Sequence, residues 1–121
     1  MSKKNIFQES IDLQLKAKEI GLDWLEVSGV IHKLKEETEE VIEAINSKDK
    51  MAMREEIGDL LFTILCLSRH LDLRPDEILD LANKKFDARY TQVLNYLKKN
   101  GKDYADPKEM EDIWQIIKKQ T

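Results

Sequence analysis

The sequence predicts an all-α protein, a bundle of four to five helices formed by a single domain over residues 1–121. Charged residues make up 36% of the chain, whereas it holds only 4 glycines and 2 prolines. This composition favours helices joined by short turns over sheet or disorder. Apolar residues recur every three or four positions through most of the chain, as in amphipathic helices that bury one face. A chain of 121 residues can bury one core but has little room for a second.

The first helix is expected from Ile6 to Ile20, and the glycine that follows is expected to end it. The segment Leu22 to Val27 suggests a short turn of helix, because Asp23 and Glu26 stand at the spacing of a capping box. Trp24 lies between them. We interpret it as a core anchor, since large aromatic side chains usually contribute buried area.

Ser28 is expected to cap a second helix that runs to about Ile45. After a polar turn, Asp49 is expected to cap a third helix that reaches about Leu71. The apolar face of this third helix is broad, which predicts burial by more than one neighbour. Gly58 weakens the helix by about 1 kcal/mol relative to alanine, and the expected compensation is a close approach by another helix or a ligand.

A fourth helix is predicted to begin at Pro75, which suits the first helical position, and to end at Asn100 and Gly101. Lys85 and Arg89 stand four residues apart on or beside its inner, apolar side. An unpaired cation is costly in such a place. Two interpretations are open: the two side chains form ion pairs with the acidic helices, or they bind phosphate oxygens.

The last helix is predicted to begin at Pro107, with Asp106 as its cap, and to run to about Lys119. Trp114 and Lys118 stand four residues apart and therefore share a face of this helix. Core packing alone would explain a tryptophan at position 114, and exposure to solvent would explain a lysine at position 118.

Two acidic pairs lie in the centre of the chain: Glu37 with Glu40, then Glu56 with Asp59. A spacing of three residues places both carboxylates of each pair on one helix face, so that the four groups can converge. Their repulsion would be strongly unfavourable without a counter-charge. Oxygen ligands of this kind suit Mg²⁺, or Mn²⁺ as a substitute, and do not suit zinc. The alternative interpretation is a solvated acidic face that pairs with neighbouring lysines.

Composition also excludes several classes of function. A net charge of −4, with acids and bases interspersed, argues against broad binding of nucleic acid. The N-terminal residues contain no signal-peptide apolar region, and the longest apolar run, Leu60 to Leu67, is too short to cross a bilayer. Cys66 is the one cysteine and cannot form an internal disulfide. We therefore expect a cytoplasmic protein with no membrane partner.

The order of these motifs resembles a known family. The acidic motifs are Glu36-Glu37-x-x-Glu40 and, after a gap of 15 residues, Glu56-x-Gly58-Asp59. Four further blocks carry the likeness: Gly21-Leu22-Asp23-Trp24, Val30 to Glu37, Ala82-Asn83-x-Lys85-Phe86-x-x-Arg89-Tyr90, and Glu109-Met110 through Trp114 to Lys118. Together they resemble the MazG nucleoside triphosphate pyrophosphohydrolases of the all-α NTP pyrophosphatase superfamily, and most closely the C-terminal repeat of two-repeat members.

The resemblance implies hydrolysis of a nucleoside or deoxynucleoside triphosphate to the monophosphate and pyrophosphate, as nucleotide-pool house-cleaning. It implies Mg²⁺ as cofactor, held by four ligands: Glu37, Glu40, Glu56 and Asp59. Glu36 would take a supporting or general-base role. The triphosphate would meet Lys85 and Arg89, which are also the implied catalytic cations, and further substrate contacts are implied for Lys33, Asn83, Trp114 and Lys118. A chain with one repeat would obtain its second repeat by self-association, as a homodimer or a dimer of dimers.

Three other interpretations are weighed against this one. A phosphoribosyl-ATP pyrophosphohydrolase would share the superfamily and the acidic motifs. A non-catalytic helical dimerisation module would use the same apolar stripes, but it would give Gly58, Lys85 and Arg89 no role. A di-iron carboxylate bundle would need Glu-x-x-His pairs, and the sequence has none.

Overall fold

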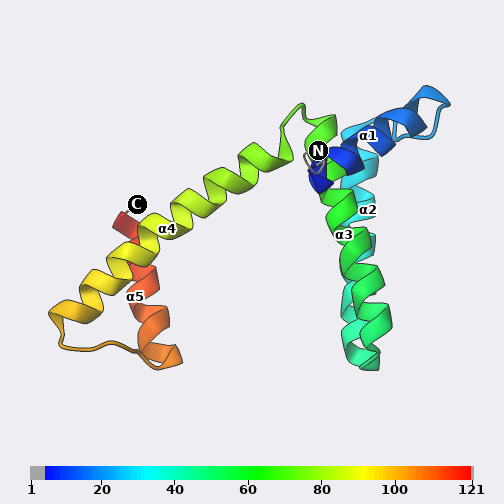
Figure 1. Cartoon of the computed structure of the whole chain (residues 1–121). Coiled ribbons are helices and arrows are strands. Elements are labelled where there is room, and N and C mark those ends of the chain that lie inside the picture. Colours follow the sequence, from blue (N-terminus) through cyan, green and yellow to red (C-terminus); the bar gives the residue numbers. More distant parts are fainter. Residues whose placement is uncertain (1–4, 121) are drawn as a thin grey trace. The chain divides into compact units, whose positions relative to one another are not determined.

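The structure, a computed structural model, describes residues 5–120. All regular secondary structure in this range is helical, in five α-helices without a strand, which confirms that the protein is all-α (Figure 1). That the helices form one bundle stays a prediction. The helices are α1 (Ile6–Glu19), α2 (Val27–Ser47), α3 (Lys50–His70), α4 (Pro75–Lys99) and α5 (Pro107–Gln120). In the described part of the chain, no helix combines the length and apolar character needed to span a membrane.

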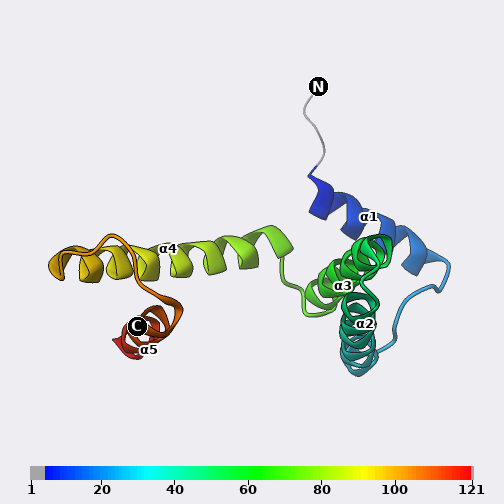
Figure 2. The ribbon, with the colours of Figure 1, turned by 90° about the horizontal axis from the view of Figure 1, so that it is seen from below.

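The chain divides into two compact units, Met1–Glu77 and Ile78–Thr121. In the first unit, α2 and α3 lie side by side and antiparallel (Figure 1), and α1 crosses the C-terminal end of α3 (Figure 2). That both units belong to one domain stays a prediction.

The ends of α1, α3 and α5 are set by local chemistry that the sequence shows. The Asn5 side chain accepts a hydrogen bond from the Phe7 amide, and Asp49 accepts from the amides of the second and third residues of α3. The Asp106 carboxylate accepts from the Glu109 amide, as a helix cap should. Gly21 ends α1 with a φ of 89°, in the left-handed region where glycine carries no steric penalty.

Two predictions about the segment between α1 and α2 are wrong. The first residue of α2 is Val27 and its cap position is Glu26, so that Ser28 lies inside the helix and caps nothing. Residues 22–26 contain bends and no helix. The expected capping box fails because the Asp23 carboxylate is engaged by Arg69 of α3, as described below.

Trp24 is not the core anchor that its size suggested, because 45% of its surface is exposed. It packs locally against Gly29, where an added Cβ would lie only 2.9 Å from the indole Cε3. Gly58, in contrast, stands in open space, since a Cβ added there would meet no atom within 4 Å. The prediction that another helix approaches Gly58 is therefore wrong for the described residues. The alternative, that a ligand approaches it, stays a prediction.

The helix α3 has two neighbours in its unit, as predicted, since it packs against both α1 and α2. Its buried positions include Thr63, Leu65, Cys66 and Ser68. A second set of apolar side chains on the same helix stays about half exposed, namely Ile57, Leu61, Phe62 and Ile64. This side of α3 is therefore apolar surface that α1 and α2 leave uncovered.

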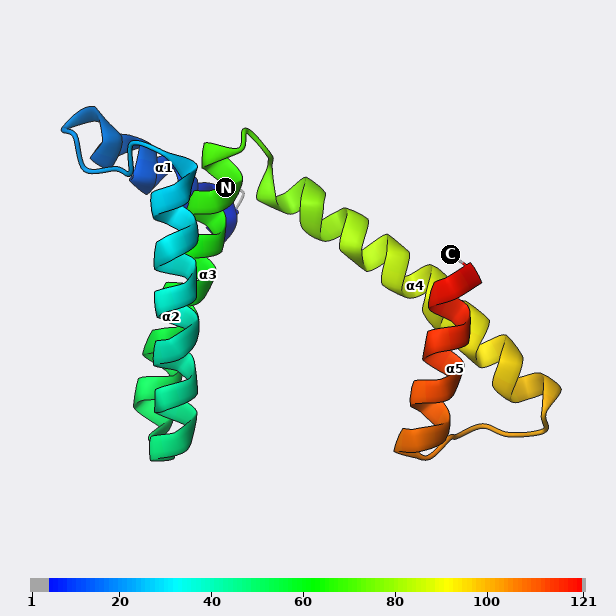
Figure 3. The ribbon, with the colours of Figure 1, turned by 180° about the vertical axis from the view of Figure 1, so that it is seen from behind.

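In the second unit, α5 folds back along the C-terminal part of α4 (Figure 3). The small core between them consists of Val93, Leu97, Ala105, Ile113 and Ile117. The predicted inner side of α4 is thus covered only over its second half. Earlier on the same helix, Leu81 remains 66% exposed, and Phe86 remains 59% exposed although its ring contacts Trp114 of α5.

Candidate metal centre and phosphate contacts

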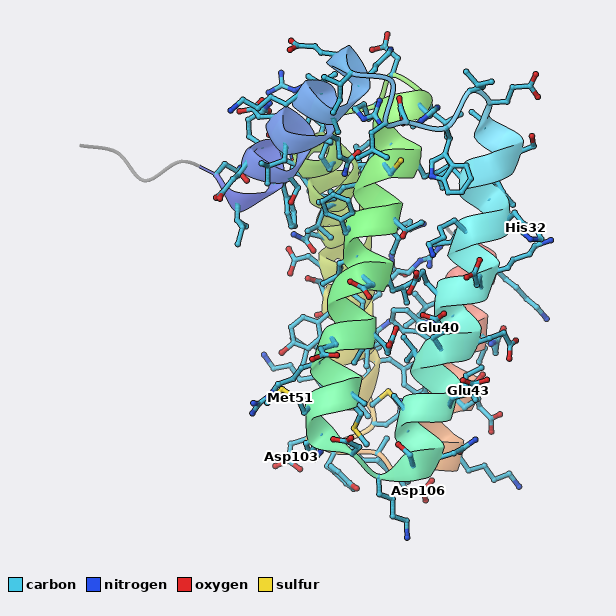
Figure 4. All side chains as sticks on the ribbon, turned by 90° about the vertical axis from the view of Figure 1, so that its right-hand side faces the viewer. His32, Glu40, Glu43, Met51, Asp103 and Asp106 are labelled. Atoms are coloured by element: carbon cyan, nitrogen blue, oxygen red, sulfur yellow. The ribbon has the colours of Figure 1, made fainter. Side chains whose placement is uncertain are left out.

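The four predicted carboxylates come together between α2 and α3. One carboxylate oxygen from each of Glu37, Glu56 and Asp59 lies within 4.8 Å of the other two. Glu40 lies beside them, close enough to Glu56 and Glu37 for both to raise the pKa of its carboxyl group. Figure 4 shows Glu40 on the side of α2 that faces α3, whereas His32 points away. The spacing of three residues on each helix thus produces the convergence that the sequence suggested.

Burial within this acidic cluster is graded from Glu37 to Asp59. The Glu37 side chain is almost completely buried at 4% exposure, Glu56 and Glu40 are half-buried, and Asp59 is exposed. The cluster is therefore closed on the side of the helix pair and open at Asp59. An open edge of this kind is what a substrate would need in order to reach a bound cation.

The neighbouring carboxylates change the protonation of Glu40. The hydrogen bond with Glu56, partial burial and the nearby Glu37 raise the pKa of Glu40 to about 7. Close to neutral pH, Glu40 is therefore partly protonated, which reduces the negative charge of the cluster. A divalent cation would remove the same conflict without a proton.

The donors fit a hard divalent cation. Glu37 Oε2 and Glu56 Oε2 are both buried and accept no hydrogen bond. Buried carboxylate oxygens without a partner are unfavourable, and a bound cation would satisfy both of them. All of the available donors are carboxylate oxygens, which suit Mg²⁺ or Mn²⁺.

Lys33 and Glu36 lie at the edge of this cluster. Lys33 Nζ lies 2.9 Å from Glu37 Oε1 and 3.6 Å from Glu36 Oε1. The contact with Glu37 raises the pKa of Lys33 and keeps the ammonium group charged. The Glu36 side chain is half exposed, beside the cluster and not within it. Lys33 is thus placed to neutralise Glu37, and its predicted contact with substrate stays a prediction.

The remaining predicted contacts lie in the second unit. Arg89 is half-buried, and its Cζ lies 5.9 Å from the centre of the Trp114 ring, a distance at which a cation is attracted to an aromatic face. Phe86 packs against the same ring, with 5.7 Å between the ring centres. Three other predicted residues of this unit are exposed, namely Asn83, Lys85 and Lys118. That these groups meet the acidic cluster on one triphosphate stays a prediction.

A polar network that sequence reasoning missed lies at the C-terminal end of α3. Arg69 donates from Nη1 and Nη2 to the two oxygens of Asp23, at 3.0 and 2.7 Å, and from Nε to the amide oxygen of buried Gln14 at 3.0 Å. His70 Nε2 lies 3.0 Å from the same carboxylate. Residues separated by 46 positions cannot be paired from spacing in one sequence, so that only the fold reveals this contact.

This network does not form a second metal centre, although Asp23, Cys66 and His70 place zinc-type donor atoms within 4.8 Å of one another. The Nη2 atom of Arg69 lies 2.7 Å from Asp23 Oδ1 and 3.6 Å from Cys66 Sγ. The guanidinium group therefore already supplies the positive charge. Burial raises the pKa of the Cys66 thiol, which further disfavours a thiolate ligand.

Comparison with known proteins places this geometry in context. Residues 26–94 match the family described as the MazG nucleotide pyrophosphohydrolase domain. That range contains the whole acidic cluster, together with Lys85 and Arg89, whereas Trp114 and Lys118 lie outside it.

Two curated relatives are similar over much of the chain. A protein of Escherichia coli (strain K12) named nucleoside triphosphate pyrophosphohydrolase is 33% identical over 112 residues, which cover 89% of this chain and 43% of the relative. A protein of Thermotoga maritima named nucleoside triphosphate pyrophosphohydrolase/pyrophosphatase MazG is 39% identical over 89 residues, which cover 74% of this chain and 34% of the relative. The chain thus spans less than half of the length of either relative.

Proposed function

Because the chain belongs to the MazG nucleotide pyrophosphohydrolase family, we propose that it hydrolyses nucleoside or deoxynucleoside triphosphates to the monophosphate and pyrophosphate. In this reaction, water adds to the α-phosphorus and the bond to the oxygen that bridges the α and β phosphates breaks. The observation that carries the proposal is the cluster of Glu37, Glu56 and Asp59, with oxygens within 4.8 Å of one another and Glu40 beside them. We further propose a role in removing unwanted nucleotides from the cellular pool.

Glu37, Glu40, Glu56 and Asp59 are the residues that would hold Mg²⁺, or Mn²⁺ in its place. The buried oxygens of Glu37 and Glu56 that lack a hydrogen bond support this assignment. A bound Mg²⁺ would neutralise triphosphate charge and lower the pKa of a coordinated water molecule.

The other residues of the site would orient the substrate and move a proton. The half-exposed Glu36 carboxylate would act as the general base that accepts a proton from the attacking water, or it would support the residue that acts as the base. Lys85 and Arg89 would bind the oxygens of the departing pyrophosphate, on which negative charge develops. Contacts to the rest of the nucleotide are proposed for Asn83, Trp114 and Lys118. Arg89 is already held against Trp114, so that both would reach the nucleotide together.

We also propose that two or four copies assemble into the active enzyme. The support is the half-exposed apolar side of α3, including Ile57 and Leu61, together with Leu81 and Phe86 on the uncovered part of α4. Groups of exposed apolar side chains are typical of an interface between subunits. A homodimer or a dimer of dimers would cover these side chains.

The decisive experiment is a product analysis. A panel of standard and modified NTPs and dNTPs, with Mg²⁺ or with EDTA, should yield monophosphate and pyrophosphate only when the metal is present, as resolved by chromatography. Glu37→Gln should abolish the reaction, and Glu39→Gln, on an exposed position of the same helix, should not. Diphosphate and orthophosphate as products would refute the proposal.

The same assay separates the two alternatives. Selective cleavage of phosphoribosyl-ATP, with little activity on NTPs, would favour the interpretation as a phosphoribosyl-ATP pyrophosphohydrolase. A complete lack of hydrolysis and of Mg²⁺ binding would favour a non-catalytic interaction module.

A further inference from the structure

Lys33 and Glu37 form an ion pair on α2, and Glu37 is the most buried member of the acidic cluster. Lys33 Nζ lies 2.9 Å from Glu37 Oε1, which is within hydrogen-bond distance. The other oxygen, Glu37 Oε2, is buried and accepts no hydrogen bond. The two oxygens of this carboxylate therefore differ, because the ammonium group occupies one of them and the other has no partner in the protein.

Stabilisation of α2 explains this ion pair poorly. Pairs four residues apart stabilise an isolated helix better when the acid precedes the base, and here the base comes first. Lys33 Nζ also lies 3.6 Å from the half-exposed Glu36, but its shorter contact is to the buried Glu37. The ammonium group is thus placed with respect to the acidic cluster.

The number of oxygens that a carboxylate offers affects which cation it binds. Mg²⁺ requires a nearly ideal octahedron, and the two oxygens of one carboxylate lie too close together to occupy two neighbouring corners of it. Ca²⁺ is larger, takes about six to eight oxygens and accepts both oxygens of one carboxylate. A carboxylate that is restricted to one oxygen therefore favours Mg²⁺ over Ca²⁺.

We propose that Lys33 is a positioning residue that sets the selectivity of the metal site. By holding Oε1, it restricts Glu37 to binding a cation through Oε2 alone, and this restriction disfavours Ca²⁺. Lys33 acts through Glu37 and is not itself a ligand, since an ammonium group has no acceptor atom. The inference rests on the proposed function, in which Glu37, Glu40, Glu56 and Asp59 hold Mg²⁺.

The charge of Lys33 has a second effect, which the test must separate from the first. A positive charge beside the acidic cluster opposes the binding of any divalent cation. Removing it would therefore strengthen the binding of Mg²⁺ and Ca²⁺ by similar factors. The ratio of the two affinities, and not either affinity alone, reports whether Glu37 is restricted to one oxygen.

The test is a calorimetric titration of the nucleotide-free protein with Mg²⁺ and, separately, with Ca²⁺, so that no turnover is needed. Lys33→Met keeps a long side chain but leaves both Glu37 oxygens free. It should raise the affinity for Ca²⁺ relative to Mg²⁺ by at least about 10-fold, the lower end of the effects of removing an outer partner of a metal ligand. Lys33→Arg, which keeps a charged donor, should retain most of the wild-type ratio. Lys35→Met is the matched control, because it removes the same charge from an exposed position of α2 and should leave the ratio unchanged.

Crystal structures with bound ions give a second readout that does not depend on affinity. With Ca²⁺ bound to Lys33→Met, both oxygens of Glu37 should lie about 2.3–2.6 Å from the ion, whereas in the wild type only Oε2 should bind it. An unchanged affinity ratio in Lys33→Met would overturn the inference, as would a wild type in which both Glu37 oxygens bind the ion. If the wild type binds neither Mg²⁺ nor Mn²⁺, the proposed function itself fails, and the inference fails with it.

Discussion

Arg69 and Asp23 form a bidentate ion pair across 46 positions of the sequence, with N–O distances of 3.0 and 2.7 Å and only 11% of either side chain exposed. This pair attaches the segment between α1 and α2 to the end of α3. Removing one partner of a buried pair leaves an uncompensated charge, which costs more than the pair itself contributes.

Arg69→Met should therefore lower the free energy of unfolding by roughly 3 kcal/mol. Arg74→Met is the matched control, since Arg74 pairs with Asp76 and Glu77 on the surface, where such contacts contribute less than about 1 kcal/mol. Urea denaturation of both variants measures the difference. Equal effects would show that the buried geometry of Arg69 has no special role.

The same ion pair predicts a stability loss in acid. Hydrogen bonds from Arg69, with smaller contributions from His70 and the Trp24 amide, hold the pKa of Asp23 well below its usual range. In acid, the unfolded chain therefore binds a proton that the folded protein does not, and stability rises with pH in this range. The stabilisation by the Asp23 ion pair is complete at a pH above about 4, the ordinary pKa of aspartate, and it is lost progressively below that pH. Asp23→Asn should flatten the curve of melting temperature against pH below pH 4.

The acidic cluster predicts the opposite slope near neutral pH. The raised pKa of Glu40, about 7, means that the metal-free folded protein holds a proton that the unfolded chain has already released. In EDTA, stability should thus fall as pH rises from about 4.5 to 7. Glu40→Gln should remove most of this decline, whereas Glu39→Gln should leave it unchanged. Melting curves across this range in EDTA are the measurement, and a flat wild-type profile would contradict the raised pKa of Glu40.

Asp59→Asn separates a metal ligand from a structural residue. If Asp59 binds Mg²⁺, the substitution removes one charge from a repelling group, so that stability in EDTA should be equal or higher while activity collapses. The increase in melting temperature on adding millimolar Mg²⁺ should also shrink, because a ligand stabilises the fold in proportion to its binding. If Asp59 instead paired with Lys85 or Arg89, a loss of roughly 3–5 kcal/mol in EDTA would follow. That loss, with an unchanged Mg²⁺ increment, would refute the metal assignment.

Self-association is predicted from the exposed apolar side of α3. The wild type should sediment as a dimer or a dimer of dimers at micromolar concentration. Leu61→Lys, at a position 53% exposed, should shift the protein toward the monomer and reduce activity. Leu25→Lys is the control, because Leu25 is fully exposed and lies outside that surface. A fully active wild-type monomer would refute the proposed assembly.

The sequence by itself determined the helices and the acidic cluster, because both depend on local periodicity. Asp49 and Asp106 mark helix starts through hydrogen bonds to residues at most three positions away, and Pro75 occupies the first position of α4. Glu37 with Glu40, and Glu56 with Asp59, needed only the pitch of a helix to share a face, and the antiparallel pairing of α2 and α3 across a short turn brought the two faces together.

Tertiary structure alone decided the contacts between distant segments. Asp23 looked like a helix cap, but Arg69 engages its carboxylate, and this competing long-range bond leaves residues 22–26 without helix. Burial of Trp24 depended on which helices would cover it, and α1 and α3 leave a cavity at that position. Capping and periodicity act within one or two helical turns, whereas burial and ion pairing depend on how the helices meet, which local spacing does not encode.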